Sequence, residues 1–351
     1  MLRNIIKQIY LYLLYGLDKL INHKIKQDHV VVFMTFKEDV LPIIKALKQE
    51  NYKITIIAHP RWMKEVESID VENVINLKNK YLYQQIKAIK NSKTVIIDTY
   101  YLLLGGIKKN KNQKIIQTWH AAGALKTFGL EDKSINQNNK RQIKNYLSVY
   151  QFTDYYLVSS DIMKDIFIRS LDAKESQMLP FGLPRLDQYK HKITRPKQDK
   201  KIALYVPTYR DYTDEIVTIN KQAFEQACPE YQLITKLHPS INSEISDSRD
   251  IQTLVEIADV IITDYSSLSI EASLLDKPII FYSYDEETYN EKRGLNEYYY
   301  EMTKMNKAFN EDELFELVNQ NKINKDIKPM WHKYTEFNAT EKLINFIQKD
   351  E

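Results

Sequence analysis

The segment at residues 259–284 constrains the fold of this chain more than any other part of its sequence. An apolar run at 260–263 is followed by a polar turn at 264–267, an amphipathic stretch at 268–275 and a second apolar run after Pro278. This order predicts a strand, a turn, a helix and a second strand, a unit that favours a right-handed crossover in a parallel sheet. Ligands of such sheets bind beyond the carboxyl ends of the strands, so we expect a ligand at the turn.

The turn has a composition that suits a phosphate. Ser266 and Ser267 supply two hydroxyls, and the start of the predicted helix supplies free backbone N–H groups. Glu271 follows neither serine at the three-residue spacing of a capping box, which leaves its carboxylate available for a ligand. The alternative is that Ser266 caps the helix and that Glu271 is a solvated residue of its second turn.

Short apolar runs alternate with helical patterns along most of the chain, as a doubly wound parallel sheet requires. Further strands are predicted at 30–36, 53–59, 94–100, 114–120, 154–160, 201–207 and 231–239. At 351 residues the chain is long enough for two domains. We expect two Rossmann-like α/β domains, 29–190 and 191–330, whose parallel sheets face a central cleft. The polar stretch 185–200 is the expected linker, and 331–351 is expected to form a closing helix.

The first 28 residues have apolar side chains at helical spacing with basic residues between them. The uninterrupted apolar run at 9–15 is too short to cross a bilayer, which takes about 20 residues. An amphipathic helix with basic flanks suits the surface of an anionic membrane, so we expect a peripheral protein of the cytoplasmic face of the membrane. The alternative is a helix that packs on the first domain.

Composition limits the classes of function. A net charge of +3 with 28% charged residues does not favour nucleic-acid binding. Cys228 is the only cysteine, which excludes an internal disulfide and a cysteine-based zinc site and fits a reducing compartment. With seven glycines, a glycine-rich phosphate loop is impossible over most of the chain. No cofactor or metal ligand set is evident, and a divalent-metal requirement stays open.

Polar side chains end the predicted strands, at the edge of each sheet where a ligand would bind. His120 ends the strand at 114–120, and a histidine with an ordinary pKa near 6.5 is well suited to take a proton from a hydroxyl at neutral pH. The alternative is a structural histidine. Gly123 and Lys126, which follow closely, favour the catalytic role.

Strands of the second domain end in polar groups of a different kind. Arg210, Lys236 and His238 supply the positive charge that phosphoryl transfer needs, because charge develops on the non-bridging oxygens. Thr208 and Asp264 lie at two of the same strand ends. Together these residues predict a clamp for the phosphates of a donor substrate.

Five motifs, in this order, resemble those of the CDP-glycerol glycerophosphotransferase family, which builds wall teichoic acid and resembles GT-B glycosyltransferases in fold. They are Trp119-His120 with Leu125-Lys126, Phe181-Gly182-Leu183-Pro184-Arg185, Pro207-Thr208-Tyr209-Arg210-Asp211, Leu237-His238-Pro239, and Thr263-Asp264-Tyr265-Ser266-Ser267 continuing to Tyr282. The resemblance runs from about Val30 to the end of the chain. Where the family's polymerases commonly have Trp-His-Gly, this chain has Trp119-His120-Ala121, a variant that resembles the primase branch.

The resemblance implies a reaction and its partners. Primases of the family add the first glycerol phosphate from CDP-glycerol to undecaprenyl-diphosphate-linked N-acetylmannosaminyl-N-acetylglucosamine, and CMP leaves. Other enzymes of teichoic acid synthesis are candidate partners. The implied roles are His120 as general base, Arg210, His238, Ser266 and Ser267 on the diphosphate, Arg185 approaching it from the hinge, Asp264 orienting the serine turn, and Glu271 on the cytidine ribose.

Three alternatives keep all or part of this pattern. A glycerol-phosphate or ribitol-phosphate polymerase of the same family would keep every motif. A GT-B nucleotide-sugar glycosyltransferase would use the same clamp with attack at an anomeric carbon. A non-catalytic membrane scaffold would be favoured by the loss of His120 or Arg210, and both residues are present.

Overall fold

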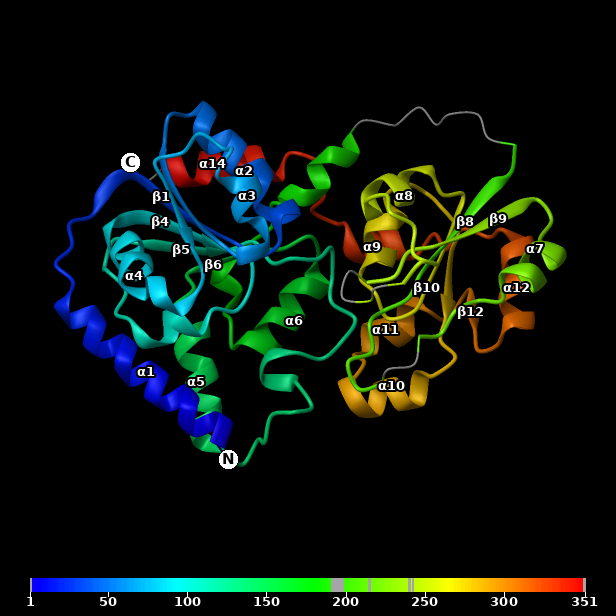
Figure 1. Cartoon of the computed structure of the whole chain (residues 1–351), viewed down its shortest axis with the longest axis horizontal. Helices are drawn as coiled ribbons and strands as arrows, with labels where there is room; N and C mark the ends of the chain where they lie inside the picture. Colours follow the sequence, from blue (N-terminus) through cyan, green and yellow to red (C-terminus); the bar gives the residue numbers. More distant parts are fainter. Residues whose placement is uncertain (1, 191–198, 214–215, 239–240, 242, 350–351) are drawn as a thin grey trace. The chain divides into compact units, whose positions relative to one another are not determined.

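The computed structural model describes residues 2–190, 199–213, 216–238, 241 and 243–349, which form two compact units (Figure 1). The first unit comprises the described parts of 1–121, 129–188 and 334–351, and the second comprises those of 122–128 and 189–333. The chain therefore passes from one unit to the other four times. Each unit is built around its own parallel sheet.

The first unit contains a seven-stranded sheet in the order β3-β2-β1-β4-β5-β6-β7. The strands are β1 (Lys26–Met34), β2 (Lys53–Ala58), β3 (Asn73–Asn76), β4 (Ser92–Ile97), β5 (Lys114–Gln117), β6 (Tyr155–Leu157) and β7 (Met178–Leu179). All of their pairings are parallel. The strand order reverses between β1 and β4, and such a switch point is where open α/β sheets bind ligands.

Helices cover both faces of this sheet. They are α1 (Leu2–Leu20), α2 (Lys37–Gln49), α3 (Met63–Val66), α4 (Leu82–Asn91), α5 (Lys140–Tyr150), α6 (Asp161–Leu171) and α14 (Ala339–Gln348). Val31 and Phe33 of β1 share a buried apolar cluster with α1 and α4, while α2 and α14 contact each other. The backbone N–H groups of Ala339 and Thr340 donate to the carboxylate of Asp187 at 2.9 and 2.8 Å, which fixes the start of α14 on this unit.

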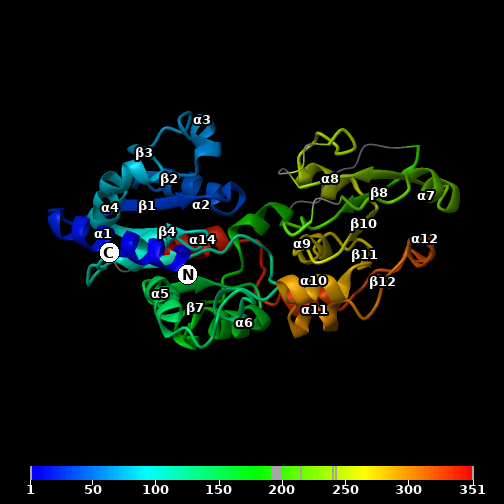
Figure 2. The ribbon, with the colours of Figure 1, turned by 60° about the horizontal axis from the view of Figure 1, so that its bottom comes forward.

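The second unit contains a five-stranded sheet in the order β12-β11-β10-β8-β9. Its strands are β8 (Lys201–Val206), β9 (Tyr231–Thr235), β10 (Val260–Thr263), β11 (Ile279–Tyr282) and β12 (Lys307–Ala308). Its helices are α7 (Lys221–Ala227), α8 (Ile251–Ile257), α9 (Leu268–Ser273), α10 (Glu286–Arg293), α11 (Glu297–Met302), α12 (Glu311–Gln320) and α13 (Ile327–Trp331). Figures 1 and 2 show α10 and α11 side by side. The switch point of this sheet lies between β8 and β10.

The predicted parallel α/β architecture is confirmed, and the departures from it are local. The sequence patterns missed β3, β7 and β12, which are two to four residues long and so give little periodicity. Helix α9 ends at Ser273 instead of 275, and Asp276 just beyond it has a φ of +50°. Residues 191–198, half of the expected linker at 185–200, lie outside the described residues. Its beginning forms a 3₁₀ helix, Pro184–Lys190.

The unit boundaries differ from the predicted ranges in two places. Residues 122–128, predicted for the first domain, group with the second unit. The chain from Tyr334 onward contains the predicted closing helix, as α14, and groups with the first unit. There the Nζ atom of Lys114 donates to the carbonyl of Phe346 at 3.3 Å. Long-range hydrogen bonds of this kind leave no signal in local sequence patterns.

Helix α1 packs one face on the first unit and exposes the other. Leu14 is fully buried and lies against Gly106, where an added Cβ would come within 2.6 Å of it. Leu11 and Ile21 are buried in the same cluster. The exposed apolar side chains of α1 are Ile5, Ile6, Ile9, Tyr12, Leu13, Tyr15 and Leu20. Among the described residues, no helix is both long enough and apolar enough to span a membrane.

Candidate active site

A buried aspartate organises the carboxyl edge of the second sheet. Asp264 follows β10 at the switch point and is completely buried. Its carboxylate accepts hydrogen bonds from the backbone N–H of Thr208, at 2.9 and 3.1 Å, and from that of Tyr265 at 2.6 Å. We predicted that Asp264 orients the serine turn. Its bonds show that it mainly holds the neighbouring loop after β8.

Arg210 is paired with two carboxylates of the second unit, and its place in the clamp stays a prediction. Its Nη1 donates to Asp264 at 2.6 Å, and its Nε and Nη2 donate to Asp285 at 3.1 and 2.8 Å. Burial acts to lower the pKa of Arg210, but the charge of Asp264 and the hydrogen bonds outweigh it, so the pKa is raised. Arg210 therefore connects its own loop, after β8, to Asp264 after β10 and to Asp285 after β11.

Lys126 has the properties of a phosphate ligand. The backbone of Lys126 forms an antiparallel bridge with Leu295. The Oγ1 atom of the next residue, Thr127, donates to the carbonyl of Arg293 at 3.1 Å. Burial lowers the pKa of Lys126, Arg293 and Arg210 lower it further, and Asp264 opposes them. Within the described residues the ammonium makes no hydrogen bond or ion pair. A cation in this state gains a partner when an anion binds.

Gly123, also predicted to bind substrate, has a packing role instead. A Cβ at this position would lie 2.3 Å from the Cδ1 atom of Ile270 and 2.7 Å from the ring of Trp331. Only glycine therefore lets the 122–128 segment approach α9 and α13 this closely. Gly123 contributes to the site by placing Lys126.

Three hydroxyls differ in their hydrogen bonds: those of Ser266 and Ser267 in the turn, and that of Thr208 in the loop after β8. The Oγ atom of Ser266 accepts the backbone N–H of Leu268 at 3.2 Å, while the N-cap residue of α9 is Ser267, whose side chain makes no capping hydrogen bond. The hydroxyl of Ser267 has no hydrogen bond within the described residues. The Oγ1 atom of Thr208 is buried and has no partner there. Ser267 and Thr208 thus keep hydrogen-bonding capacity for a ligand.

Glu271 and Lys236 are engaged by the protein. The Oε1 atom of Glu271 accepts the hydroxyl of Tyr189 at 2.6 Å, and the side chain is buried instead of solvated. The Nζ atom of Lys236 donates to the carbonyls of Asp247 and Arg249 at 2.7 and 2.6 Å. Lys236 therefore holds the 247–249 loop, and its assignment to the clamp stays a prediction. The ribose role of Glu271 stays a proposal.

His238 remains a candidate ligand for the donor. Its residue is exposed, and its ring stacks on that of Tyr209 with 5.2 Å between the centroids and 19° between the planes. Arg293 is a site candidate that the sequence patterns missed. It forms an ion pair with Asp211 and acts electrostatically on Lys126. The signal that the sequence offered is the glycine directly after Arg293. In the structure this residue, Gly294, has a φ of +80°.

His120, in the first unit, is held in one tautomer. Its Nδ1 atom lies 2.9 Å from the carbonyl oxygen of Asp98, which can only accept, so Nδ1 carries the proton and Nε2 carries the lone pair. Phe36 stacks on the imidazole with 4.4 Å between centroids and 12° between planes. An imidazole oriented by a second group in this way suits a general base.

Asp98 is the counterpart of Asp264 in the first unit, and the motifs did not predict it. It follows β4 at the switch point and is completely buried. Its Oδ2 atom accepts the backbone N–H groups of Thr35 and Phe36 at 2.6 and 2.7 Å, and its Oδ1 atom accepts the hydroxyl of Tyr101. Burial raises the pKa of Asp98 to about 6, against these hydrogen bonds.

Arg185 makes hydrogen bonds within the first unit, and its approach to the donor diphosphate stays a prediction. Its Nη1 atom donates to Asp39 at 3.1 Å and to the carbonyl of His120 at 3.0 Å. Arg185 therefore fixes the backbone of the candidate base.

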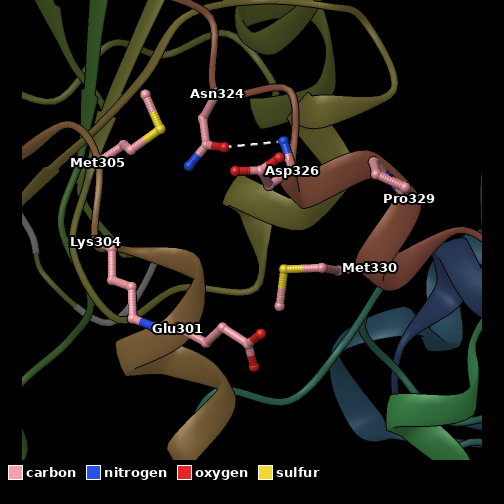
Figure 3. A pocket seen from close by; sticks show the side chains of 7 residues that line it. All are labelled: Glu301, Lys304, Met305, Asn324, Asp326, Pro329 and Met330. Atoms are coloured by element: carbon pink, nitrogen blue, oxygen red, sulfur yellow. Dashed lines mark hydrogen bonds between the residues drawn. The ribbon is translucent and has the colours of Figure 1, made fainter.

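A cavity of about 570 Å³ in the second unit lies apart from these residues (Figure 3). Its lining residues are Glu301, Lys304, Met305, Asn324, Asp326, Pro329 and Met330. Lys304 and Met305 precede β12, so the cavity lies toward the amino ends of the strands. None of the predicted site residues lines it.

Comparisons with known proteins agree with the motifs. The sequence matches the family described as CDP-Glycerol:Poly(glycerophosphate) glycerophosphotransferase over residues 17–349. It is 43% identical to the teichoic acid glycerol-phosphate primase of Staphylococcus aureus (strain NCTC 8325 / PS 47) over 98% of both chains. The primase of Bacillus subtilis (strain 168) is 35% identical over 99% of this chain and 98% of its own. The solved wall teichoic acid polymerase TagF matches with a TM-score of 0.73 at 18% identity, over 99% of this chain and 96% of that one, which confirms the predicted GT-B-like fold.

Arg210→Met is expected to lower the free energy of unfolding by about 3–5 kcal/mol, because two carboxylates lose their buried partner. Arg249→Met removes a largely exposed ion pair with Asp247 and should cost no more than about 1 kcal/mol. Chemical denaturation of both variants measures the difference. If Arg210→Met loses activity but is as stable as Arg249→Met, Arg210 is a phosphate ligand after all.

Asp98→Asn should change how stability depends on pH. The pKa of Asp98 rises from 3.8 to about 6 on folding, so its stabilising contribution is complete below pH 3.8 and is lost as the pH rises through 6. The unfolding free energy of the variant minus that of the wild type should therefore increase by about 2 kcal/mol between pH 4 and pH 7. A difference that stays constant across this range would contradict the assignment.

Proposed function

Because the chain belongs to the CDP-glycerol:poly(glycerophosphate) glycerophosphotransferase family, it is a transferase, and we propose that it carries out the first transfer to a wall teichoic acid acceptor. One glycerol phosphate passes from CDP-glycerol to the N-acetylmannosamine of undecaprenyl-diphosphate-linked N-acetylmannosaminyl-N-acetylglucosamine, and CMP is released. The primase relatives, matched over almost their whole lengths, favour this reaction over polymerisation.

The observation that carries the donor side of the proposal is the unpaired ammonium of Lys126. The donor diphosphate binds Lys126, with Arg293 and the hydroxyls of Ser267 and Thr208 as further ligands. These groups offset the charge that develops on the non-bridging oxygens during transfer. Arg210 and Asp264 hold the loops in place, so little reorganisation is needed when the donor binds.

His120 acts on the acceptor. Its Nε2 takes the proton from the attacking sugar hydroxyl as the new oxygen–phosphorus bond forms. The bond between that phosphorus and the oxygen bridging to CMP breaks, and CMP leaves with the bonding electron pair. The proton bound by His120 then passes to solvent. His238 contacts the donor, and Glu271 binds its ribose.

The exposed face of α1 supports attachment to the cytoplasmic face of a membrane. Ile6, Ile9 and Leu13 are each more than half exposed, although Leu14 anchors the helix from behind. Helix α5 lies beside α1 (Figures 1 and 2) and adds the exposed cations Lys140, Arg141 and Lys144. Apolar side chains in the headgroup boundary, flanked by cations, bind anionic lipid surfaces. Packing on the first unit and attachment to a membrane, the two predicted alternatives for this helix, are therefore compatible.

His120→Ala is expected to abolish transfer while the affinity for CDP-glycerol changes by no more than a few fold, because a base contributes little to donor binding. Lys126→Gln should weaken CDP-glycerol binding by about ten- to a hundred-fold, the usual range for a hydrogen bond to a charged group. Calorimetry on both variants decides between the roles. An equal loss of donor affinity in both would make His120 a phosphate ligand.

The double substitution Ile6→Asp and Leu13→Asp should release the protein from phosphatidylglycerol vesicles, because it places charges in the headgroup boundary. The matched control is Ile245→Asp with Ile323→Asp, at two similarly exposed isoleucines of the second unit. Vesicle sedimentation compares them. If the α1 variant sediments with the vesicles to the same extent as the control, the only role of α1 is to pack on the first unit.

A further inference from the structure

The dipeptide Thr35-Phe36 joins the loop after β2 to the candidate base. Its two backbone N–H groups donate to Asp98, whose own carbonyl accepts the Nδ1–H of His120. The carbonyl of Thr35 accepts the Nη2–H of Arg61 and, at 2.9 Å, the Nε1–H of Trp62. Arg61 is therefore fixed to the same framework as His120, although it comes from a different loop.

The guanidinium of Arg61 lies over two aromatic rings. Its central carbon is 5.7 Å from the centroid of Phe36 and 4.9 Å from that of Trp62. Phe36 in turn stacks on His120, so one aromatic ring separates the cation from the imidazole. Stacking holds the flat guanidinium in place at little further entropic cost when a ligand arrives.

No carboxylate neutralises this cation. Among the described residues, Arg61 forms no ion pair, and its residue is exposed. The acidic groups nearby are engaged elsewhere, since Glu65 pairs with Lys37 at 3.2 Å and Asp98 accepts three hydrogen bonds. Of the N–H donors of the guanidinium, one is used by Thr35. The remaining donors match the oxygens of a phosphate.

We propose that Arg61 binds the diphosphate of the lipid-linked acceptor and so directs the acceptor hydroxyl toward His120. The inference rests on the proposed function, in which the diphosphate is one disaccharide away from the attacking hydroxyl. The cations assigned to the donor, Lys126 and Arg293, belong to the second unit, whereas Arg61 shares the first unit with the base. An anion bound at Arg61 is therefore assigned to the acceptor.

The test compares two acceptors that differ only in the anion: the disaccharide linked to a short prenyl chain by diphosphate, and the same disaccharide as a neutral alkyl glycoside. Arg61→Gln should raise the KM of the diphosphate acceptor by about ten- to a hundred-fold. The KM of the neutral acceptor and that of CDP-glycerol should stay within about threefold of the wild type. The matched control, Lys64→Gln, removes an exposed cation three residues away and should change neither.

Equal effects of Arg61→Gln on both acceptors, or a raised KM for CDP-glycerol, would overturn the proposal. Binding of farnesyl diphosphate, measured by calorimetry with CMP at saturation to occupy the donor side, gives a readout that needs no turnover. It should weaken at least tenfold in Arg61→Gln, and unchanged binding would likewise overturn the assignment. A wild type that transfers no glycerol phosphate, but binds farnesyl diphosphate through Arg61, would refute the proposed function and leave the anion site standing.

Discussion

Two buried aspartates, one in each unit, each hold a loop at the carboxyl edge of the sheet in their own unit. Asp98 follows β4 and binds the backbone of the loop after β1, while Asp264 follows β10 and binds the backbone of the loop after β8. In both sheets the aspartate and the loop it holds flank the switch point of the strand order. A carboxylate that accepts several hydrogen bonds from a neighbouring loop fixes that loop without covering its outer surface.

The surroundings of the two aspartates differ in charge, and the difference matches the roles proposed for the units. Asp264 has a guanidinium partner, Arg210, at 2.6 Å. Asp98 has only backbone N–H groups and a tyrosine hydroxyl as partners, and its pKa rises to about 6. The second unit therefore has fixed charges around an unpaired lysine, which suits the binding of a diphosphate. The first unit has, behind an oriented imidazole, a carboxylate that has no cationic partner among the described residues, which suits proton transfer.

Much of the fold followed from the sequence, because buried parallel strands are continuous apolar runs that local patterns reveal. The motifs also pointed to the correct strand ends. They carry no information about the partner of a side chain, since sequence shows that Arg210, Lys236 and Arg185 are cations but not which acceptors they bind. Each proved to be engaged by the protein. Lys126 and Arg61 stand out because no carboxylate within the described part of the chain is paired with them.

The most direct test of the central claim is the mass of the product. The full-length protein is incubated with excess CDP-glycerol and the undecaprenyl-diphosphate-linked disaccharide, and the lipid product is analysed by mass spectrometry. The account predicts one added glycerol phosphate per acceptor and one CMP released for each. A ladder of products with many glycerol phosphates would contradict the assignment to a first transfer, and the absence of any added glycerol phosphate would contradict the transferase function itself.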